Sequence, residues 1–277
     1  MGASSKLTRS IPFRRAVPAA LLAASLVGCA SDVTESFRID EAQGRTENIY
    51  SLTQVIDRNP KDPDAYNTRG QALTRAGEFK KARRDFDKAI ELDKKYFQAY
   101  ANRAVAKRAL GDTFGAQRDY TDALKINSRY DTAYIGRGEI YRREGRLDEA
   151  LLDFNRAIQL DTTNPRAFAR RGLVYQVQDK HQEAIEDFST AISLAPDQPQ
   201  GYNGRGLSYA ALNDLDNAMS DFTTALTLDK SIAESWANQA FVYETQGKRA
   251  KAAKSYARAV QLDPDYTPAQ RGLDRVR

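Results

Sequence analysis

The sequence has 277 residues, 29% of them charged, with one cysteine and one histidine. One cysteine excludes an internal disulfide, and so few Cys and His side chains exclude His/Cys metal cages and nucleophile–base pairs of these residues. The net charge of +5 comes mostly from the first 28 residues, which hold four basic and no acidic residues and leave 38 basic against 37 acidic residues. Because nucleic-acid binding needs a stripe of Lys and Arg, we exclude that class of partner.

Residues 1–28 have the order of a secretory signal. Basic residues precede an acid-free apolar run over 16–28, and these 13 residues are too few to span a bilayer, which takes about 20. The run ends in LVGC (26–29), which resembles the lipobox of bacterial lipoproteins, where a signal peptidase cleaves before the cysteine and lipid is attached to its sulfur. The resemblance implies that Cys29 is the lipidation site. An unmodified thiol or an uncleaved anchor is the alternative.

The residues after Cys29 bear on location and on the first helix. In Gram-negative lipoproteins an aspartate after the cysteine holds the protein at the inner membrane, whereas this chain has Ala30. The resemblance therefore implies an outer-membrane anchor facing the periplasm, with the inner membrane as the alternative. Residues 29–44 lack a sustained apolar period and predict a flexible tether. Residues 45–62 predict an amino-terminal capping helix, whose apolar face holds Ile49, Leu52, Val55 and Ile56.

Residues 63–266 carry a pattern that recurs every 34 residues. The six units are 63–96, 97–130, 131–164, 165–198, 199–232 and 233–266. Positions 4, 8 and 11, and again 20, 24, 27 and 30, are apolar or small at helical spacing, which predicts two facing helices per unit. Positions 4 and 24 are aromatic throughout, and position 20 is always alanine, where we expect the helix axes to approach closely. Position 15 separates the helices with residues that tolerate the left-handed conformation: Gly77, Gly111, Gly145, Asp179, Asn213 and Gly247.

This pattern resembles the tetratricopeptide repeat, a helix-turn-helix of 34 residues. The resemblance implies an all-α fold, a right-handed superhelical solenoid of six repeats in which 45–62 acts as a half-repeat cap. At the other end, Thr267 and Pro268 are suited to begin a short helix over 267–277. Its apolar stripe of Ala269, Leu273 and Val276 predicts a carboxy-terminal capping helix.

Two polar positions change together along the repeats. Position 7, commonly Leu in the family, is arginine in five units, position 23 is aspartate in the same five, and the sixth unit has Gln239 and Ser255 instead. Pairing each aspartate with the next unit's arginine would leave Asp221 opposite Gln239, so we predict structural ion pairs within units. Independent, solvated side chains are the alternative. The predicted pairs are Arg69–Asp85, Arg103–Asp119, Arg137–Asp153, Arg171–Asp187 and Arg205–Asp221.

Two single residues depart from the pattern. Lys107 occupies position 11, where the other units have Leu or Tyr, and we expect its stem to lie along the groove with its ammonium group in water. His181 lies near the turn between two predicted helices, and we interpret it as a partly exposed turn residue rather than a catalytic base.

The family resemblance implies a partner-binding groove lined by positions 2, 5, 9 and 12 of the first helices. An apolar strip of Leu173, Leu207 and Phe241 is predicted to pack against nothing in its own chain and to bind a partner segment. A clamp for carboxy-terminal peptides uses Lys at position 5 and Asn at position 9 in some members, and Asn67 and Gln71 do not support it. The candidate groove residues are Asn67, Gln71, Val105, Arg108, Ile135, Glu139, Arg142, Leu173, Gln176, Asn203, Leu207 and Phe241.

We expect no enzyme, no cofactor and no metal. The lipobox together with the repeats resembles the new lipoprotein I family, whose members are adaptors that gather cell-wall hydrolases and proteases at the outer membrane. The resemblance implies a lipid-anchored periplasmic scaffold with protein partners, contacting the membrane through the lipid on Cys29; a homodimer stays open. Alternatives are a pilotin-like or outer-membrane assembly lipoprotein and, from another class, direct peptidoglycan binding or a non-catalytic subunit of an enzyme complex.

Overall fold

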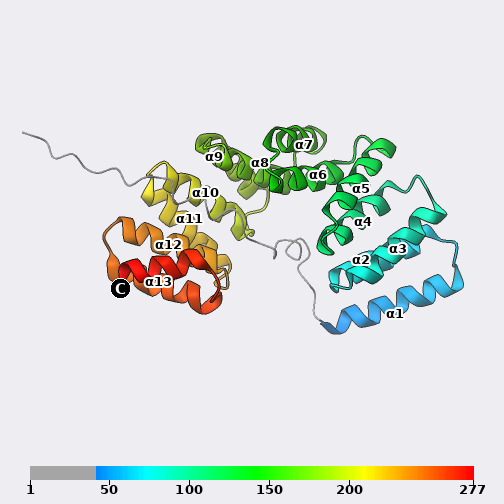
Figure 1. Cartoon of the computed structure of the whole chain (residues 1–277), viewed down its shortest axis with the longest axis horizontal. Coiled ribbons are helices and arrows are strands. Elements are labelled where there is room, and N and C mark those ends of the chain that lie inside the picture. Colours follow the sequence, from blue (N-terminus) through cyan, green and yellow to red (C-terminus); the bar gives the residue numbers. More distant parts are fainter. Residues whose placement is uncertain (1–41) are drawn as a thin grey trace, which may run out of the picture.

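The computed structural model describes residues 42–277, and within them it contains fourteen α-helices and no strand (Figure 1). The predicted signal peptide, Cys29 and most of the predicted tether lie outside the described residues. The prediction of an all-helical solenoid is confirmed. The helices are α1 (Ala42–Arg58), α2 (Pro63–Arg75), α3 (Phe79–Leu92), α4 (Phe97–Ala109), α5 (Thr113–Ile126), α6 (Asp131–Arg143), α7 (Leu147–Leu160), α8 (Pro165–Val177), α9 (His181–Leu194), α10 (Pro199–Ala211), α11 (Leu215–Leu228), α12 (Ala233–Thr245), α13 (Arg249–Leu262) and α14 (Thr267–Val276).

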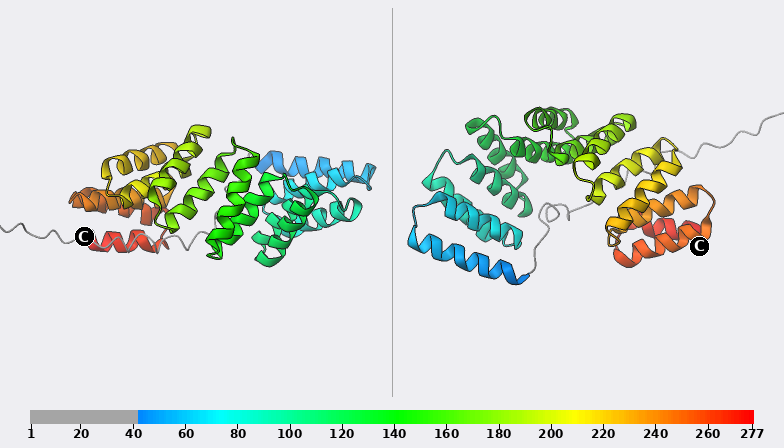
Figure 2. Two further views of the ribbon diagram at one scale, coloured as in Figure 1. Left: turned by 90° about the horizontal axis from the view of Figure 1, so that it is seen from above. Right: turned by 180° about the vertical axis from the view of Figure 1, so that it is seen from behind.

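From α2 to α13 the helices pack as consecutive pairs, and the pairs stack side by side into an arc (Figures 1 and 2). The first helices of neighbouring pairs, such as α6 and α8, contact each other, whereas the second helices, such as α7 and α9, do so much less. In a curved stack the elements on the inner side lie closer together. The first helices α2, α4, α6, α8, α10 and α12 therefore line the concave side.

Small residues let the two helices of a pair approach each other. All six position-20 alanines, from Ala82 to Ala252, are fully buried. At position 8 the aromatic ring of position 24 lies against the backbone: a Cβ added to Gly138 would lie 2.9 Å from Cε1 of Phe154. The Phe154 ring is itself completely buried. Because interiors are packed to near-crystalline density, such contacts fix the spacing of the helices.

The turn inside each pair depends on one left-handed residue, at position 15. Gly77, Gly111, Gly145 and Gly247 have φ between 72° and 85°, while Asp179 and Asn213 have φ of 56° and 62°. The backbone N–H after each of these residues, as at Arg146, donates to a carbonyl of the helix that has just ended. This arrangement satisfies the orphan carbonyls of the helix end.

We expect Gly145→Asn to cost less stability than Gly145→Val. A Cβ at Gly145 would meet no atom within 4 Å, so the two variants differ in backbone preference alone. Asparagine accepts the left-handed conformation at Asn213, whereas a β-branched residue there costs on the order of 1–3 kcal/mol. Urea midpoints of the two variants measure the difference, and equal midpoints would contradict this account of the turn.

The two end helices close the solenoid. Helix α1 begins at Ala42, three residues before the predicted start, and packs on α2. Ile56 is buried, but Val55 is 45% exposed. Val55 does not lie on the predicted apolar face, because the six residues that separate it from Ile49 are not a whole number of helical turns. At the other end Ala269, Leu273 and Val276 of α14 are buried against α12 and α13. The predicted cap thus covers the last pair.

Candidate functional site

The structure places each position-7 arginine against the position-23 aspartate of the same helix pair. In all five pairs Nε and Nη2 donate to the two carboxylate oxygens at 2.7–2.9 Å. The aspartate side chains are 2–9% exposed and the arginine side chains 16–22% exposed. In the sixth unit the Ser255 hydroxyl donates to Oε1 of Gln239 at 3.1 Å. Bidentate pairs of this kind are the stronger class of ionic contact, because both geometry and charge are matched.

Each of these arginines also reaches back to the preceding helix pair, a contact that the sequence analysis missed. Its Nη1 donates to a polar side chain on the preceding second helix, or on α1 for the first arginine, 16 residues earlier in the chain. For Arg137 this acceptor is Oγ1 of Thr121, at 3.3 Å. The arginines therefore join neighbouring pairs as well as the two helices of one pair. The acceptors are Thr53, Asp87, Thr121, Asn155 and Ser189.

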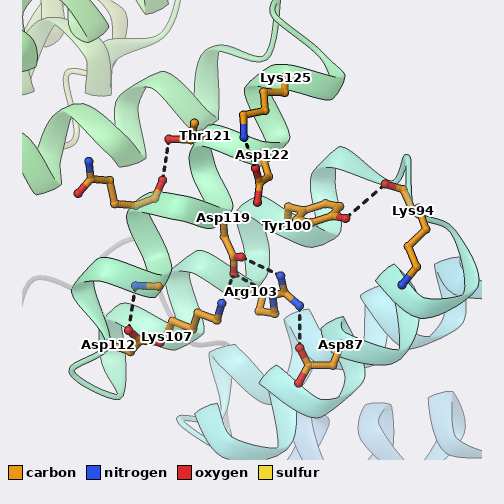
Figure 3. Close-up of polar contacts among 12 residues, drawn as sticks. Asp87, Lys94, Tyr100, Arg103, Lys107, Asp112, Asp119, Thr121, Asp122 and Lys125 are labelled. Carbon is orange, nitrogen blue, oxygen red and sulfur yellow. Dashed lines mark hydrogen bonds and ion pairs between the residues drawn. The ribbon is translucent and has the colours of Figure 1, made fainter.

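Lys107 corrects one of our expectations. Its Nζ lies 2.9 Å from Oδ2 of Asp119, which also accepts from Arg103, so the ammonium group is not held in water as predicted. Two cations share a carboxylate that is 2% exposed, and Asp87 accepts from Nη1 of Arg103 at 2.8 Å (Figure 3). The buried carboxylate attracts Lys107 more strongly than the solvent does, because ionic interactions strengthen away from water.

Five of the twelve predicted groove residues are buried and serve contacts between neighbouring first helices. Position-5 side chains lie between adjacent helices of the inner row, so the premise that this position is free for a partner was wrong. Oδ1 of Asn203 accepts from Ser235 and Asn238 of the next first helix at 3.3 and 3.0 Å. Nε2 of Gln176 donates to the Gly204 carbonyl and to Oγ of Ser208. The buried five are Asn67, Ile135, Glu139, Gln176 and Asn203.

The middle residue of the predicted apolar strip contacts its own chain. Leu207 packs against a buried cluster that includes Phe222 and Val242, so it does not lie on a face without contacts. Leu173, Leu207 and Phe241 are all partly exposed on the first helices. The other predicted groove residues that stay partly exposed are Gln71, Val105, Arg108 and Arg142.

A cavity of about 90 Å³ opens on the concave side between α4, α6 and α8. Its lining combines apolar walls, including Val105 and Ile135, with polar groups from four helices. The titratable groups among them are Arg108 of α4, Tyr120 of α5, Glu139 of α6, and Arg166 and Arg170 of α8. We call this site the arginine pocket. Arg108 and Glu139 were predicted to line the groove, whereas Tyr120, Arg166 and Arg170 were not.

The carboxylate of Glu139 is already bound within the chain. Nε and Nη2 of Arg142 donate to its two oxygens at 2.9 and 2.8 Å, and Nε of Arg143 donates at 2.8 Å. Nε of Arg170 lies 4.0 Å from Oε2. Burial alone would raise the pKa of Glu139, but the hydrogen bond from Arg142 and the charges of the neighbouring arginines lower it to about 2. Glu139 is therefore ionised near neutral pH and organises the arginines around it.

The arginine pocket holds more positive charges than the single negative charge of Glu139 balances. Nε of Arg108 is buried and has no hydrogen-bond partner among the described residues. Surrounding protein atoms first, and then the charge of Arg170, lower the pKa of Arg166, but Arg166 is exposed to solvent, which weakens both effects. A cation next to other cations in a partly dry site favours an anionic ligand.

The remaining titratable candidate is His181, the first residue of α9. Its side chain is 20% exposed, its Nε2 lies 3.9 Å from a carboxylate oxygen of Asp179, and its Nδ1 is buried without a partner among the described residues. Over residues 42–277 no cluster of His, Cys, Asp and Glu could hold a metal ion, and no helix is long and apolar enough to cross a membrane.

Comparison with protein families accounts for the helix pairs. Models described as tetratricopeptide repeat or TPR repeat match residues 62–130, 138–179, 165–198, 199–232 and 233–266. The chain belongs to the tetratricopeptide repeat family. Proteins built from tetratricopeptide repeats bind protein partners, so this chain is a repeat scaffold for protein–protein interaction. Comparison with curated proteins finds no match.

Solved structures of other tetratricopeptide repeat proteins resemble this solenoid. The Cut9–Hcn1 hetero-tetramer of APC/C gives a TM-score of 0.78 at 20% identity, covering 84% of this chain and only 46% of that chain. PilW, a type IV pilus biogenesis factor, gives 0.69 at 18% identity over 76% of this chain and 98% of that chain. YrrB, a TPR protein with an unusual peptide-binding site, gives 0.53 at 26% identity over 68% of this chain and 97% of that chain.

Proposed function

We propose that this chain is a non-catalytic adaptor that binds a segment of a partner protein in its concave groove. The observation that carries the proposal is the inner row of first helices, where partly exposed Leu173 and Phe241 accompany an unfilled, charged cavity. Apolar side chains that stay open beside polar ones are suited to hold an extended or helical peptide. YrrB, a TPR protein with an unusual peptide-binding site, has a related fold.

We further propose that the adaptor is a lipoprotein anchored through Cys29 at the outer membrane, facing the periplasm. Support comes from the basic head, the short apolar run and the LVGC sequence that precede the repeats, and from the likeness of this combination to the new lipoprotein I family. Such a protein would gather cell-wall hydrolases or envelope proteases near the membrane. Because α1 begins at Ala42, a tether of about 12 residues would let the solenoid reach roughly 40 Å into the periplasm.

Anchoring is tested by Cys29→Ser in cells. We expect the wild-type chain in the outer-membrane fraction, labelled by a clickable palmitate analogue, and the variant unlabelled and absent from that fraction, because two or more acyl chains are needed for stable anchoring. Fractionation followed by immunoblotting is the measurement. A labelled variant, or a wild-type chain in the soluble fraction, would refute the anchor and leave the groove unaffected.

The groove is tested by in-cell crosslinking of the double variant Leu173→Glu/Phe241→Glu. We expect it to lose the protein partners that the wild-type chain captures, because charges would be placed where a partner buries apolar surface. Leu152→Glu is the matched control, since Leu152 is 69% exposed on α7, a second helix. Unchanged capture by a folded double variant would remove the groove assignment, and capture of purified peptidoglycan without any protein would favour wall binding.

A second candidate function is a role in type IV pilus assembly, as an envelope lipoprotein of the pilotin-like kind. The observation that favours it is the likeness to PilW, which this solenoid matches over 98% of that chain. Deletion of the encoding gene would then abolish surface pili, counted by electron microscopy, and the double groove variant would fail to restore them. Normal piliation in the deletion strain would reject this candidate.

A further inference from the structure

The arginine pocket has the side chain of a tyrosine in its lining. Tyr120 is 3% exposed, and its ring lies so close to α6 that a Cβ added to Gly136 would be 2.6 Å from the hydroxyl oxygen. No hydrogen bond of this hydroxyl is made with any residue between 42 and 277. Position 24 is phenylalanine in four of the six units, so the fold does not need a hydroxyl here. Because Tyr120 lines the pocket, its hydroxyl is available to donate a hydrogen bond to a ligand there.

The sixth unit shows what such a hydroxyl binds. Tyr256 is the other tyrosine at position 24, and its hydroxyl donates to Oε2 of Glu244 at 2.8 Å. The same carboxylate accepts two hydrogen bonds from Arg275 of α14, at 2.9 and 3.0 Å. A carboxylate held jointly by a buried tyrosine hydroxyl and an arginine fork is therefore built into this chain at one end.

In the second unit the residue that corresponds to Glu244 is Arg108, so the chain does not provide this carboxylate. Two arginines that could bind one are present. Nε of Arg108 is buried without a partner among the described residues, and Arg166 is exposed. The nearby carboxylate of Glu139 is held by Arg142 and Arg143. Glu139 occupies the position of Arg275, so the two charges are exchanged between the sites. The second unit therefore has the Tyr120 hydroxyl and two guanidinium groups in the pocket lining, with no carboxylate of the described residues bound to them.

We propose that the arginine pocket binds the carboxylate side chain of an aspartate or glutamate in a partner's peptide segment. Tyr120 and the guanidinium groups of Arg108 and Arg166 donate to it, and Val105 and Ile135 contact its methylene groups. The cavity of about 90 Å³ accommodates an acidic side chain, and paired guanidinium–carboxylate contacts favour a carboxylate over a neutral amide. The inference rests on the proposed function and adds to it the kind of partner residue that the groove selects, which is an acidic one.

Selection of a displayed library of random peptides tests the proposal with the full chain. We expect peptides bound by the wild-type chain to share one acidic residue at a fixed place. The double variant Arg108→Gln/Arg166→Gln and the variant Tyr120→Phe should select peptides without that preference. Arg83→Gln/Arg84→Gln is the matched control, because it removes two exposed arginines of α3, and it should select as the wild-type chain does.

One selected peptide then provides the quantitative test. Changing its acidic residue to the amide should weaken binding to the wild-type chain by about 10- to 100-fold and change binding to Arg108→Gln/Arg166→Gln by less than about threefold. An equal loss on both proteins, or selected peptides without a fixed acidic residue, overturns the arginine pocket while leaving the groove. If no peptide is selected at all, the proposed function fails with it. Tyr120→Phe keeps the test informative should the double arginine variant fold poorly.

Discussion

Replacing Arg137 by glutamine is expected to lower the free energy of unfolding by about 3–5 kcal/mol, because it leaves a buried carboxylate without its cation. Asp153 is 5% exposed and would lose both bidentate hydrogen bonds. Asp153→Ser should be less severe, since Arg137 would keep its contact with Thr121 and the faces of Tyr134 and Tyr141, each 5.8 Å away. Urea denaturation followed by circular dichroism measures both losses.

The double variant Arg137→Gln/Asp153→Ser recreates the Gln239–Ser255 arrangement of the sixth unit, in which the serine hydroxyl bonds the amide at 3.1 Å. We expect it to be more stable than Arg137→Gln alone, with an interaction free energy of about 1–3 kcal/mol between the two changes. Arg156→Gln, on the exposed side of α7, is the control and should stay within about 0.5 kcal/mol of the wild-type chain. Strict addition of the two single losses would show that the pair is not coupled.

Contacts within one unit could be inferred from the sequence, because each position occurs six times and the residues found there can be compared between units. Position 15 varies only among Gly, Asn and Asp, and all six residues have positive φ. Gln239 and Ser255 change together, which points to a partnership between positions 7 and 23. The contact from Arg137 to Thr121 escaped prediction, because it depends on how far one helix pair is rotated against the preceding one. No pattern inside a unit encodes that rotation.

The arginine pocket could not be predicted from the sequence, for the same reason. Its arginines come from position 12 of one unit and from positions 2 and 6 of a unit two further along the chain, and only the curvature of the stack brings them together around α6. Conversely, the buried Asn203 and Gln176 were assigned to the groove because position numbers do not reveal how closely neighbouring first helices pack. One signal was available in the sequence: tyrosine replaces phenylalanine at position 24 only at Tyr120 and Tyr256.

Phe154→Ala is expected to be as damaging as the loss of an ion-pair partner, at about 3–5 kcal/mol, because it opens a cavity in a packed interior. The ring is completely buried and joins a cluster with Ile135 of α6 and Val174 of α8, so one side chain connects two helix pairs. Leu152→Ala is the matched control: it lies two residues away on the same helix but is 69% exposed, and its cost should stay within about 0.5 kcal/mol.

The location of the stability loss in Phe154→Ala tests whether each helix pair depends only on its neighbours. In a stack where each unit contacts only its neighbours, stability is approximately a sum of unit and interface contributions. Phe154→Ala should therefore reduce amide hydrogen-exchange protection in α6, α7 and α8 first, while α12, α13 and α14 keep theirs, because their cluster around Tyr256 and Leu273 shares no residue with that of Phe154. Uniform loss from α2 to α14 would instead indicate a single cooperative core. Local loss would mean that the arginine pocket, which adjoins α6 and α8, is the part of the groove most sensitive to this change.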